Sequence, residues 1–204
     1  MTAKLSADGL TLFRGERCLF QGLSFALNPG ELLLLEGRNG SGKTSLMRAI
    51  AGLIEFEDGD VLWEGKPIRT NRPDFYGSVV WMQHRVGFKA DLTLVENLRF
   101  ESHLRAQSGA DLDVVLKRLD IDRLKRLPLR SLSAGQQRRV ALARMLLSSV
   151  PLWLMDEPFT NLDREGRALV MDLTTEHLSK GGMCIMAAHQ DVEIGGNVTK
   201  IELK

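Results

Sequence analysis

Residues 37–45 have the composition and spacing of a phosphate-binding loop. Glycine lets a backbone curl so that successive N–H groups point at phosphate oxygens, and a following helix adds its positive N-terminal end. In the pattern G-x-x-x-x-G-K-[ST], the lysine reaches the β- and γ-phosphates and the hydroxyl coordinates Mg²⁺. The sequence therefore predicts a site for ATP and Mg²⁺ made by Gly37, Arg38, Asn39, Gly40, Ser41, Gly42, Lys43, Thr44 and Ser45.

Two adjacent carboxylates follow an apolar run over residues 151–155. A buried strand of a parallel sheet brings its C-terminal residues to the edge where nucleotides bind. Because phosphoryl transfer depends mostly on positioning and charge stabilisation, one carboxylate for the metal and one for the attacking water are enough. We expect Asp156 to hold Mg²⁺ and Glu157 to orient the water, with Lys43 as a second catalytic side chain. The alternative, a solvent-exposed acidic turn before Pro158, is disfavoured by the phosphate-binding loop upstream.

The segment LSAGQ at residues 132–136 opens a predicted helix. Ser133 is a good N-cap residue, and the amide of Gly135 would lie at the positive end of the helix. This segment is either simply a capped helix or a second set of donors for a γ-phosphate. The basic residues that follow, Arg138 and Arg139, are interpreted as a solvated helix face.

Together these motifs resemble those of the ABC ATPases, with Ala134 where the family's LSGGQ signature has its first glycine. The resemblance implies a head-to-tail homodimer that forms on ATP binding and holds each ATP between the phosphate-binding loop of one subunit and the signature of the other. His189 matches the switch histidine that contacts the γ-phosphate, which makes it a third catalytic candidate. The residues implied to act on the partner's nucleotide are Ser133, Ala134, Gly135, Gln136 and, in the D-loop at residues 160–163, Asp163.

Two positions depart from the usual ABC pattern. Counted from the LTLVEN segment at residues 92–97, the Q-loop glutamine falls on His84, with Gln83 one residue earlier. Either side chain is therefore a candidate to act near Mg²⁺. The aromatic residue that stacks on adenine falls on Arg14, beside Phe13, and both side-chain types can lie flat on a base. The remaining alternative is that neither residue contacts the base and Phe13 lies in the core.

These departures narrow the resemblance to one branch of the family. The chain resembles, over nearly its whole length, the ATP-binding subunit of the cytochrome c maturation (haem exporter) ABC complex. The segments that carry this resemblance are residues 81–84, 87–89, 132–144, 156–160 and 188–190.

The narrower resemblance implies a peripheral ATPase on the cytoplasmic face of a bacterial inner membrane. It would couple ATP hydrolysis to the handling or export of haem or of a haem chaperone. Integral membrane permease subunits are the implied partners, and residues 84–100 are the expected wall of their docking groove. Val86 and Phe88 are candidates for that wall, and the alternative for both is a place in the core. The alternatives are the ATPase of another importer or exporter, for a lipoprotein, metal or peptide, and a soluble ABC protein of translation or DNA repair.

Strand-like and helical patterns alternate along the chain. Apolar runs over residues 31–36, 59–63, 79–82, 151–155 and 184–188 alternate with helical patterns, which predicts a mainly parallel sheet with helices on both faces. The helical patterns cover residues 43–53, 92–119, 134–148 and 165–179. Residues 5–25 alternate about a turn near Gly15, which predicts an antiparallel hairpin.

The expected fold is therefore α/β, a P-loop NTPase core of the ABC ATPase type. It comprises a mainly parallel sheet, an N-terminal antiparallel β subdomain and an α-helical subdomain inserted at about residues 88–148. We expect residues 1–204 to form a single domain.

Composition limits the possible partners. A formal net charge of +1 gives no signal for nucleic acid, so no nucleic-acid partner is expected. No apolar run approaches the roughly 20 residues that span a bilayer, so another chain would have to supply any span. Cys18 and Cys184 lack the spacing of metal ligands and are expected to be reduced structural thiols.

Overall fold

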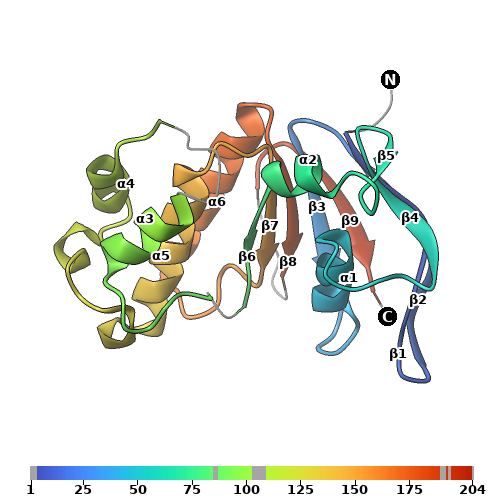
Figure 1. Ribbon diagram of the computed structural model, residues 1–204, viewed down its shortest axis with the longest axis horizontal. Coiled ribbons are helices and arrows are strands. Elements are labelled where there is room, and N and C mark those ends of the chain that lie inside the picture. The colour runs from blue at the N-terminus through green and yellow to red at the C-terminus, as the bar shows by residue number, and fades with distance from the viewer. Residues whose placement is uncertain (1–3, 85–86, 103–108, 189–191, 193, 204) are drawn as a thin grey trace.

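The structure, a computed structural model, describes residues 4–84, 87–102, 109–188, 192 and 194–203. Figure 1 shows an antiparallel sheet at one end of the molecule, a parallel sheet in the middle and a group of helices at the other end. None of the helices within the described ranges is long and apolar enough to cross a membrane.

The N-terminal strands form the predicted antiparallel hairpin, with its turn at Gly15. The first strand also pairs with a later strand, which extends the hairpin into a sheet of order β2-β1-β4-β5. The strands of this sheet are β1 (Leu5–Arg14), β2 (Arg17–Leu27), β4 (Asp58–Trp63) and β5 (Lys66–Pro67).

The second sheet is parallel at every pairing and has the order β6-β7-β8-β3-β9. The carboxyl ends of its strands therefore meet at one edge, where open α/β sheets bind their ligands. The sequence patterns predict four of these strands and miss β9, an edge strand whose residues are all at least partly exposed. The strands are β3 (Glu31–Glu36), β6 (Val79–Met82), β7 (Leu152–Asp156), β8 (Met183–Ala187) and β9 (Asn197–Glu202).

Alternate residues of the parallel strands pack into two separate cores. Leu32 and Leu34 belong to the core that faces most of the helices, whereas Leu33 and Leu35 belong to the core that faces the antiparallel sheet. Both faces of the parallel sheet are thus buried. This burial explains why its central strands are continuous apolar runs instead of alternating ones.

The described residues include six α-helices, and the ends of these helices follow local backbone chemistry. The first helix ends at Ile50, earlier than predicted, because Gly52 takes a left-handed φ of 68° and Leu53 N–H bonds back to Arg48. The short second helix was not predicted. The helices are α1 (Lys43–Ile50), α2 (Arg72–Gly77), α3 (Leu94–Ser102), α4 (Leu112–Arg118), α5 (Ala134–Leu147) and α6 (Arg164–Ser179).

Helices α3 and α4 both pack on α5, and α5 in turn packs on strand β6 of the parallel sheet. Figure 1 shows this group at the end of the molecule opposite the antiparallel sheet. Helix α5 is therefore the element through which the inserted helices contact the sheet. The division into one domain with a helical insertion stays a prediction.

Candidate functional site

The phosphate-binding loop joins the end of β3 to the start of α1. No side chain among the described residues caps the first turn of α1, whose N-cap position is Gly42, so its amides remain available to an anion. The hydroxyl of Ser41 is buried and has no hydrogen-bond partner within the described part of the chain. Leaving such a group unpaired costs about 1–3 kcal/mol. A phosphate oxygen would remove this cost, so the loop suits a nucleotide.

Lys43 lies folded over the same loop. Its side chain is buried, and its ammonium donates to the carbonyls of Gly37 and Arg38 at 2.6 and 3.1 Å. Burial lowers the pKa of Lys43, while the nearby carboxylates of Glu157 and Asp156 oppose that shift. The ammonium is thus held at the loop by backbone oxygens that phosphate oxygens could replace.

We expect Gly37→Ala to lower the free energy of unfolding by about 2–4 kcal/mol. Gly37 has a φ of 137°, and an added Cβ would lie 2.2 Å from the carbonyl oxygen of Leu203. Gly40→Ala is the matched control, because Gly40 has a φ of 81° but nothing within 4 Å of an added Cβ. That control should lose only the roughly 1–2 kcal/mol of a left-handed residue. Urea denaturation measures the free energy of unfolding of both variants. Equal losses of stability would contradict the importance of the close approach between Gly37 and the Leu203 carbonyl.

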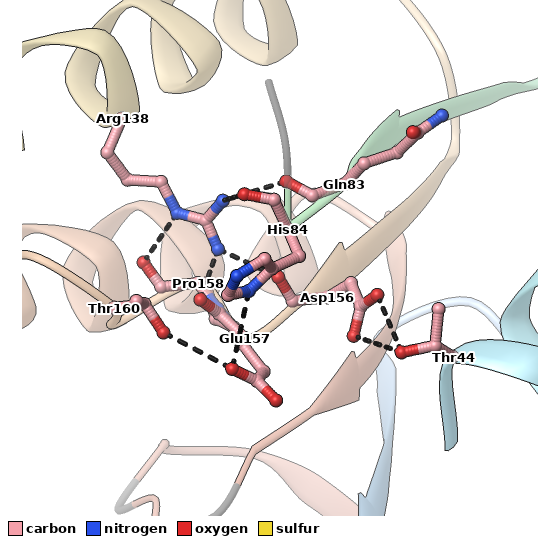
Figure 2. A network of polar contacts seen from close by, with 8 residues as sticks. All are labelled: Thr44, Gln83, His84, Arg138, Asp156, Glu157, Pro158 and Thr160. Carbon is pink, nitrogen blue, oxygen red and sulfur yellow. Dashed lines mark hydrogen bonds and ion pairs between the residues drawn. The ribbon is translucent and has the colours of Figure 1, made fainter. Parts of the chain in front are cut away.

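The two predicted Mg²⁺ ligands Thr44 and Asp156 lie in contact at the edge of the parallel sheet. The hydroxyl of Thr44, at the start of α1, donates to both carboxylate oxygens of Asp156, at 3.0 and 3.3 Å (Figure 2). Asp156 ends β7 and is only 2% exposed, and burial is the main cause that raises its pKa. A hydroxyl and a buried carboxylate are the hard oxygen donors that Mg²⁺ prefers. These two side chains therefore fit the metal.

Glu157 follows Asp156 in a constrained turn. Its φ is 50°, in the left-handed region, and its N–H donates to the carbonyl of Ala187 at 2.9 Å. Its carboxylate accepts a long hydrogen bond from the hydroxyl of Thr160 at 3.4 Å. The predicted metal-binding and water-orienting acids thus lie side by side at the edge of the sheet and point in different directions (Figure 2).

The geometry separates the two Q-loop candidates. Nδ1 of His84 lies 3.4 Å from Oε2 of Glu157, whereas the side chain of Gln83 points away from both acids (Figure 2). Gln83 instead lines a pocket that also includes Trp81. The structure therefore brings His84 to the hydrolytic residues and leaves Gln83 facing another surface. Whether either residue contacts the metal stays a prediction.

The signature segment forms a capped and exposed helix start. The Ser133 hydroxyl accepts from the N–H of Gln136 at 3.2 Å, and the Gln136 side chain accepts from the N–H of Ser133 at 2.9 Å. An added Cβ on Gly135 would lie 2.7 Å from the carbonyl oxygen of Asn161 in the D-loop. Ala134 is exposed, so its methyl group has space. This contrast explains why the family's first glycine is dispensable here and the second is not.

The remaining predicted residues have mixed outcomes. Asp163 caps α6 by accepting from the N–H of Gly166 at 2.7 Å, which gives it a role within its own chain besides the predicted one across a dimer. Phe13 is 41% exposed at the end of β1, so its alternative placement in the core is wrong. Arg14 is exposed beside it. His189 lies outside the described residues.

Arg138 is the site residue that sequence reasoning missed. Its interpretation as a solvated helix face is wrong, because it is only 3% exposed and its guanidinium donates to backbone carbonyls of the turn that carries the acids and of the loop after β6 (Figure 2). Burial is the main cause that lowers the pKa of Arg138, to about 10, so the side chain stays charged at neutral pH. Helical periodicity was the available signal, since the buried Leu142 and Met145 follow it on the same face.

Arg139 points elsewhere. It donates to the carbonyl of Leu119 at 2.9 Å and lies within 4.0 Å of Asp163. The two consecutive arginines therefore have different surroundings, as the helical period requires.

Comparisons with known proteins agree with this geometry. The family model described as ABC transporter matches residues 20–160. The chain is 45% identical over 203 residues to the cytochrome c biogenesis ATP-binding export protein CcmA of Methylococcus capsulatus, covering 98% of each chain. It is 44% identical over 199 residues to the protein of the same name from Yersinia pestis, covering 97% of this chain and 91% of that protein.

Solved structures share the fold at lower identity. An ATP-binding subunit of an ABC transporter superposes with a TM-score of 0.83 at 23% identity, over 92% of this chain and 80% of that chain. An ABC transporter ATP-binding protein from Pyrococcus furiosus gives a TM-score of 0.81 at 20% identity, over 96% of each chain. The α/β fold expected from the sequence is thus confirmed. The family match and the similarity to CcmA proteins along nearly the whole length show that this chain belongs to the ABC transporter family, as an ATP-binding subunit.

Proposed function

We propose that this chain is the ATP-hydrolysing subunit of a bacterial inner-membrane ABC complex for c-type cytochrome biogenesis. The proposal of ATP hydrolysis rests on one contact. The Thr44 hydroxyl, at the end of the phosphate-binding loop, donates to the carboxylate of Asp156, and Glu157 is the next residue. The similarity to the CcmA proteins supports the branch and the export function. Within that branch, hydrolysis would be coupled to the handling of haem or of its chaperone.

The roles of the side chains follow from their places. The loop amides and Lys43 bind the phosphates, while Thr44 and Asp156 hold Mg²⁺, which supplies charge neutralisation at the phosphate oxygens when bound. Glu157 orients the attacking water, and its contacts with Thr160 and His84 hold the direction of its carboxylate. In this proposal Phe13 or Arg14 stacks on the adenine, and the exposure of both side chains leaves them available for it.

The active unit is a homodimer in this proposal. Ser133 and Ala134 are exposed at the start of α5, so they can reach a nucleotide on another subunit. The capping box holds Gln136 against that helix start, and the contact of Gly135 with Asn161 fixes the signature relative to the D-loop. Asp163 and the signature would complete the partner's site.

A pocket of about 370 Å³ between α1, α2 and β6 is the proposed docking place for a membrane permease subunit. Leu53 and Tyr76 line it and are 59% and 40% exposed, and Nε1 of Trp81 is buried there without a partner among the described residues. Phe88, one predicted groove residue, lies instead under the guanidinium of Arg144, at 5.2 Å. Val86 lies outside the described residues.

We expect Leu53→Arg to reduce recovery of the membrane partner by at least about tenfold when the complex is isolated through this chain. A charge placed in the centre of an apolar contact loses about 2 kcal/mol or more of binding energy. Val114→Arg is the matched control, since Val114 is 63% exposed on α4, away from the pocket. Equal recovery with both variants would contradict this docking place, and unchanged thermal stability would show that both are folded.

Isolation of the native membrane complex, with identification of its subunits, tests the proposed function. A cytochrome c biogenesis permease in the complex is the expected result. Recovery of a permease for a lipoprotein, metal or peptide would contradict the branch while leaving the ATPase chemistry in place.

A further inference from the structure

One guanidinium is hydrogen-bonded to two separate parts of the chain at the hydrolytic site, residues 83–84 and residues 156–158. Nη1 of Arg138 donates to the carbonyls of Gln83 and His84 at 2.8 and 3.4 Å. Nη2 donates to the carbonyl of Asp156 at 2.7 Å and to that of Glu157, and Nε donates to the carbonyl of Pro158 at 3.2 Å. All five N–H groups of the side chain are therefore used on backbone oxygens.

These contacts fix the backbone on both sides of Glu157. The carbonyl of Asp156 belongs to the peptide plane before Glu157, and the carbonyl of Glu157 belongs to the plane after it. Holding both planes determines φ and ψ of Glu157, whose φ of 50° is one that a glutamate rarely adopts. The direction in which its side chain leaves the backbone is therefore set by Arg138.

The same geometry recurs at His84. The carbonyls of Gln83 and His84 belong to the peptide planes that flank His84, and both accept from the same nitrogen of Arg138. The side chains of His84 and Glu157 then meet at 3.4 Å (Figure 2). One buried cation thus aligns two residues from different loops with each other.

Arg138 also connects these loops to the signature. It lies in α5, whose first residues are the exposed signature segment, so its contacts link that helix to the end of β6 and to the turn after β7. A second arginine of the same helix, Arg144, donates to the carbonyl of Trp81 at 2.6 Å and holds the preceding part of β6. Helix α5 is therefore linked directly to the Q-loop and the strand before it by two arginine side chains.

We propose that Arg138 is a positioning residue for ATP hydrolysis, which fixes the carboxylate of Glu157 against His84 and couples both to the signature helix. This role rests on the proposed function of Glu157 as the residue that orients water. It acts through Glu157, and within the part of the chain that the structure describes its hydrogen bonds go to residues 83–84 and 156–158, outside the phosphate-binding loop. Arg138 should therefore affect turnover and leave nucleotide binding to one subunit intact.

The test compares the full chain with Arg138→Gln and Arg138→Lys. Each rate is divided by the number of ATP sites measured by equilibrium binding, so an unfolded fraction does not count as lost turnover. We expect Arg138→Gln to lower kcat per site roughly 10- to 100-fold, as misplacement of a reacting group does, with the dissociation constant for ATP within about twofold of wild type. Arg138→Lys keeps the positive charge but lacks the planar guanidinium with its five donors. It should therefore keep part of the kcat that Arg138→Gln loses.

Arg118→Gln is the control for removing an arginine, because Arg118 pairs with Glu176 in contacts outside the site. It should keep kcat per site. A kcat per site for Arg138→Gln equal to that of this control would overturn the positioning role, as would equal loss in the glutamine and lysine variants.

A double variant separates this inference from the function on which it rests. If Arg138 acts through Glu157, adding Arg138→Gln to Glu157→Gln should cause no further loss of kcat per site. An additional loss as large as in the wild-type background would overturn the proposal. Loss in Glu157→Gln but not in Arg138→Gln overturns only the positioning role. A wild-type rate in Glu157→Gln overturns both.

Discussion

Glu157→Gln should keep ATP bound and lower kcat by roughly 100-fold or more, the usual range for removal of a catalytic base. The amide has nearly the size of the carboxylate, and it can retain the contacts with Thr160 and His84. It cannot polarise a water through negative charge. Binding should persist because the phosphate-binding loop, Lys43 and the Thr44–Asp156 pair are unchanged.

The same variant should accumulate as an ATP-bound dimer, because hydrolysis is the step that would release the two subunits. Size-exclusion chromatography with and without ATP measures the dimer, and phosphate release measures the rate. Asp172→Asn is the matched control, since Asp172 is an exposed carboxylate on α6. A wild-type hydrolysis rate in Glu157→Gln would contradict the assigned role, and a monomer at saturating ATP would contradict the dimer.

The parallel sheet could be predicted because burial on both faces produces long apolar runs. Strands β3, β7 and β8 are such runs, and each ends at or close to a residue with predicted chemistry. Strand β9 could not be found in this way. It lies at the edge beside β3, its residues are all exposed or partly exposed, and its pairing depends on a strand more than 150 residues earlier in the chain.

The motif residues of the site were predictable because the chemistry expected of them fixes both their residue types and their spacing in the sequence. The choice between Gln83 and His84 was not, because a shift of one residue in a strand end reverses the direction of the side chain. Arg138 was hidden for another reason. Its partners are backbone carbonyls from two distant loops, and a carbonyl has no sequence signature. Only the fold shows that these oxygens converge on a single buried cation.

Substitution of the signature residue Ser133 should also have a large effect on ATP hydrolysis. Ser133→Arg should abolish hydrolysis while each subunit still binds ATP. Ser133 is exposed, and in the proposed dimer the substitution would put a long cation on the surface that faces the partner's nucleotide. Loss of the N-cap alone costs about 0.5–2 kcal/mol of stability. Ser133→Ala therefore serves as the control for the cap, and Ser149→Arg, exposed just beyond the other end of α5, serves as the control for the charge.

Mixing Ser133→Arg with Lys43→Ala tests whether the sites are shared. Neither variant alone can form an intact site, but a mixed dimer has one, made by the phosphate-binding loop of the Ser133→Arg chain and the signature of the Lys43→Ala chain. With equal mixing, half of the dimers are mixed and each has one of its two sites intact, so activity should approach about a quarter of wild type if the sites act independently. If each chain carried its whole site, mixing would restore nothing. A gain on mixing therefore distinguishes a shared site from a complete site in each subunit.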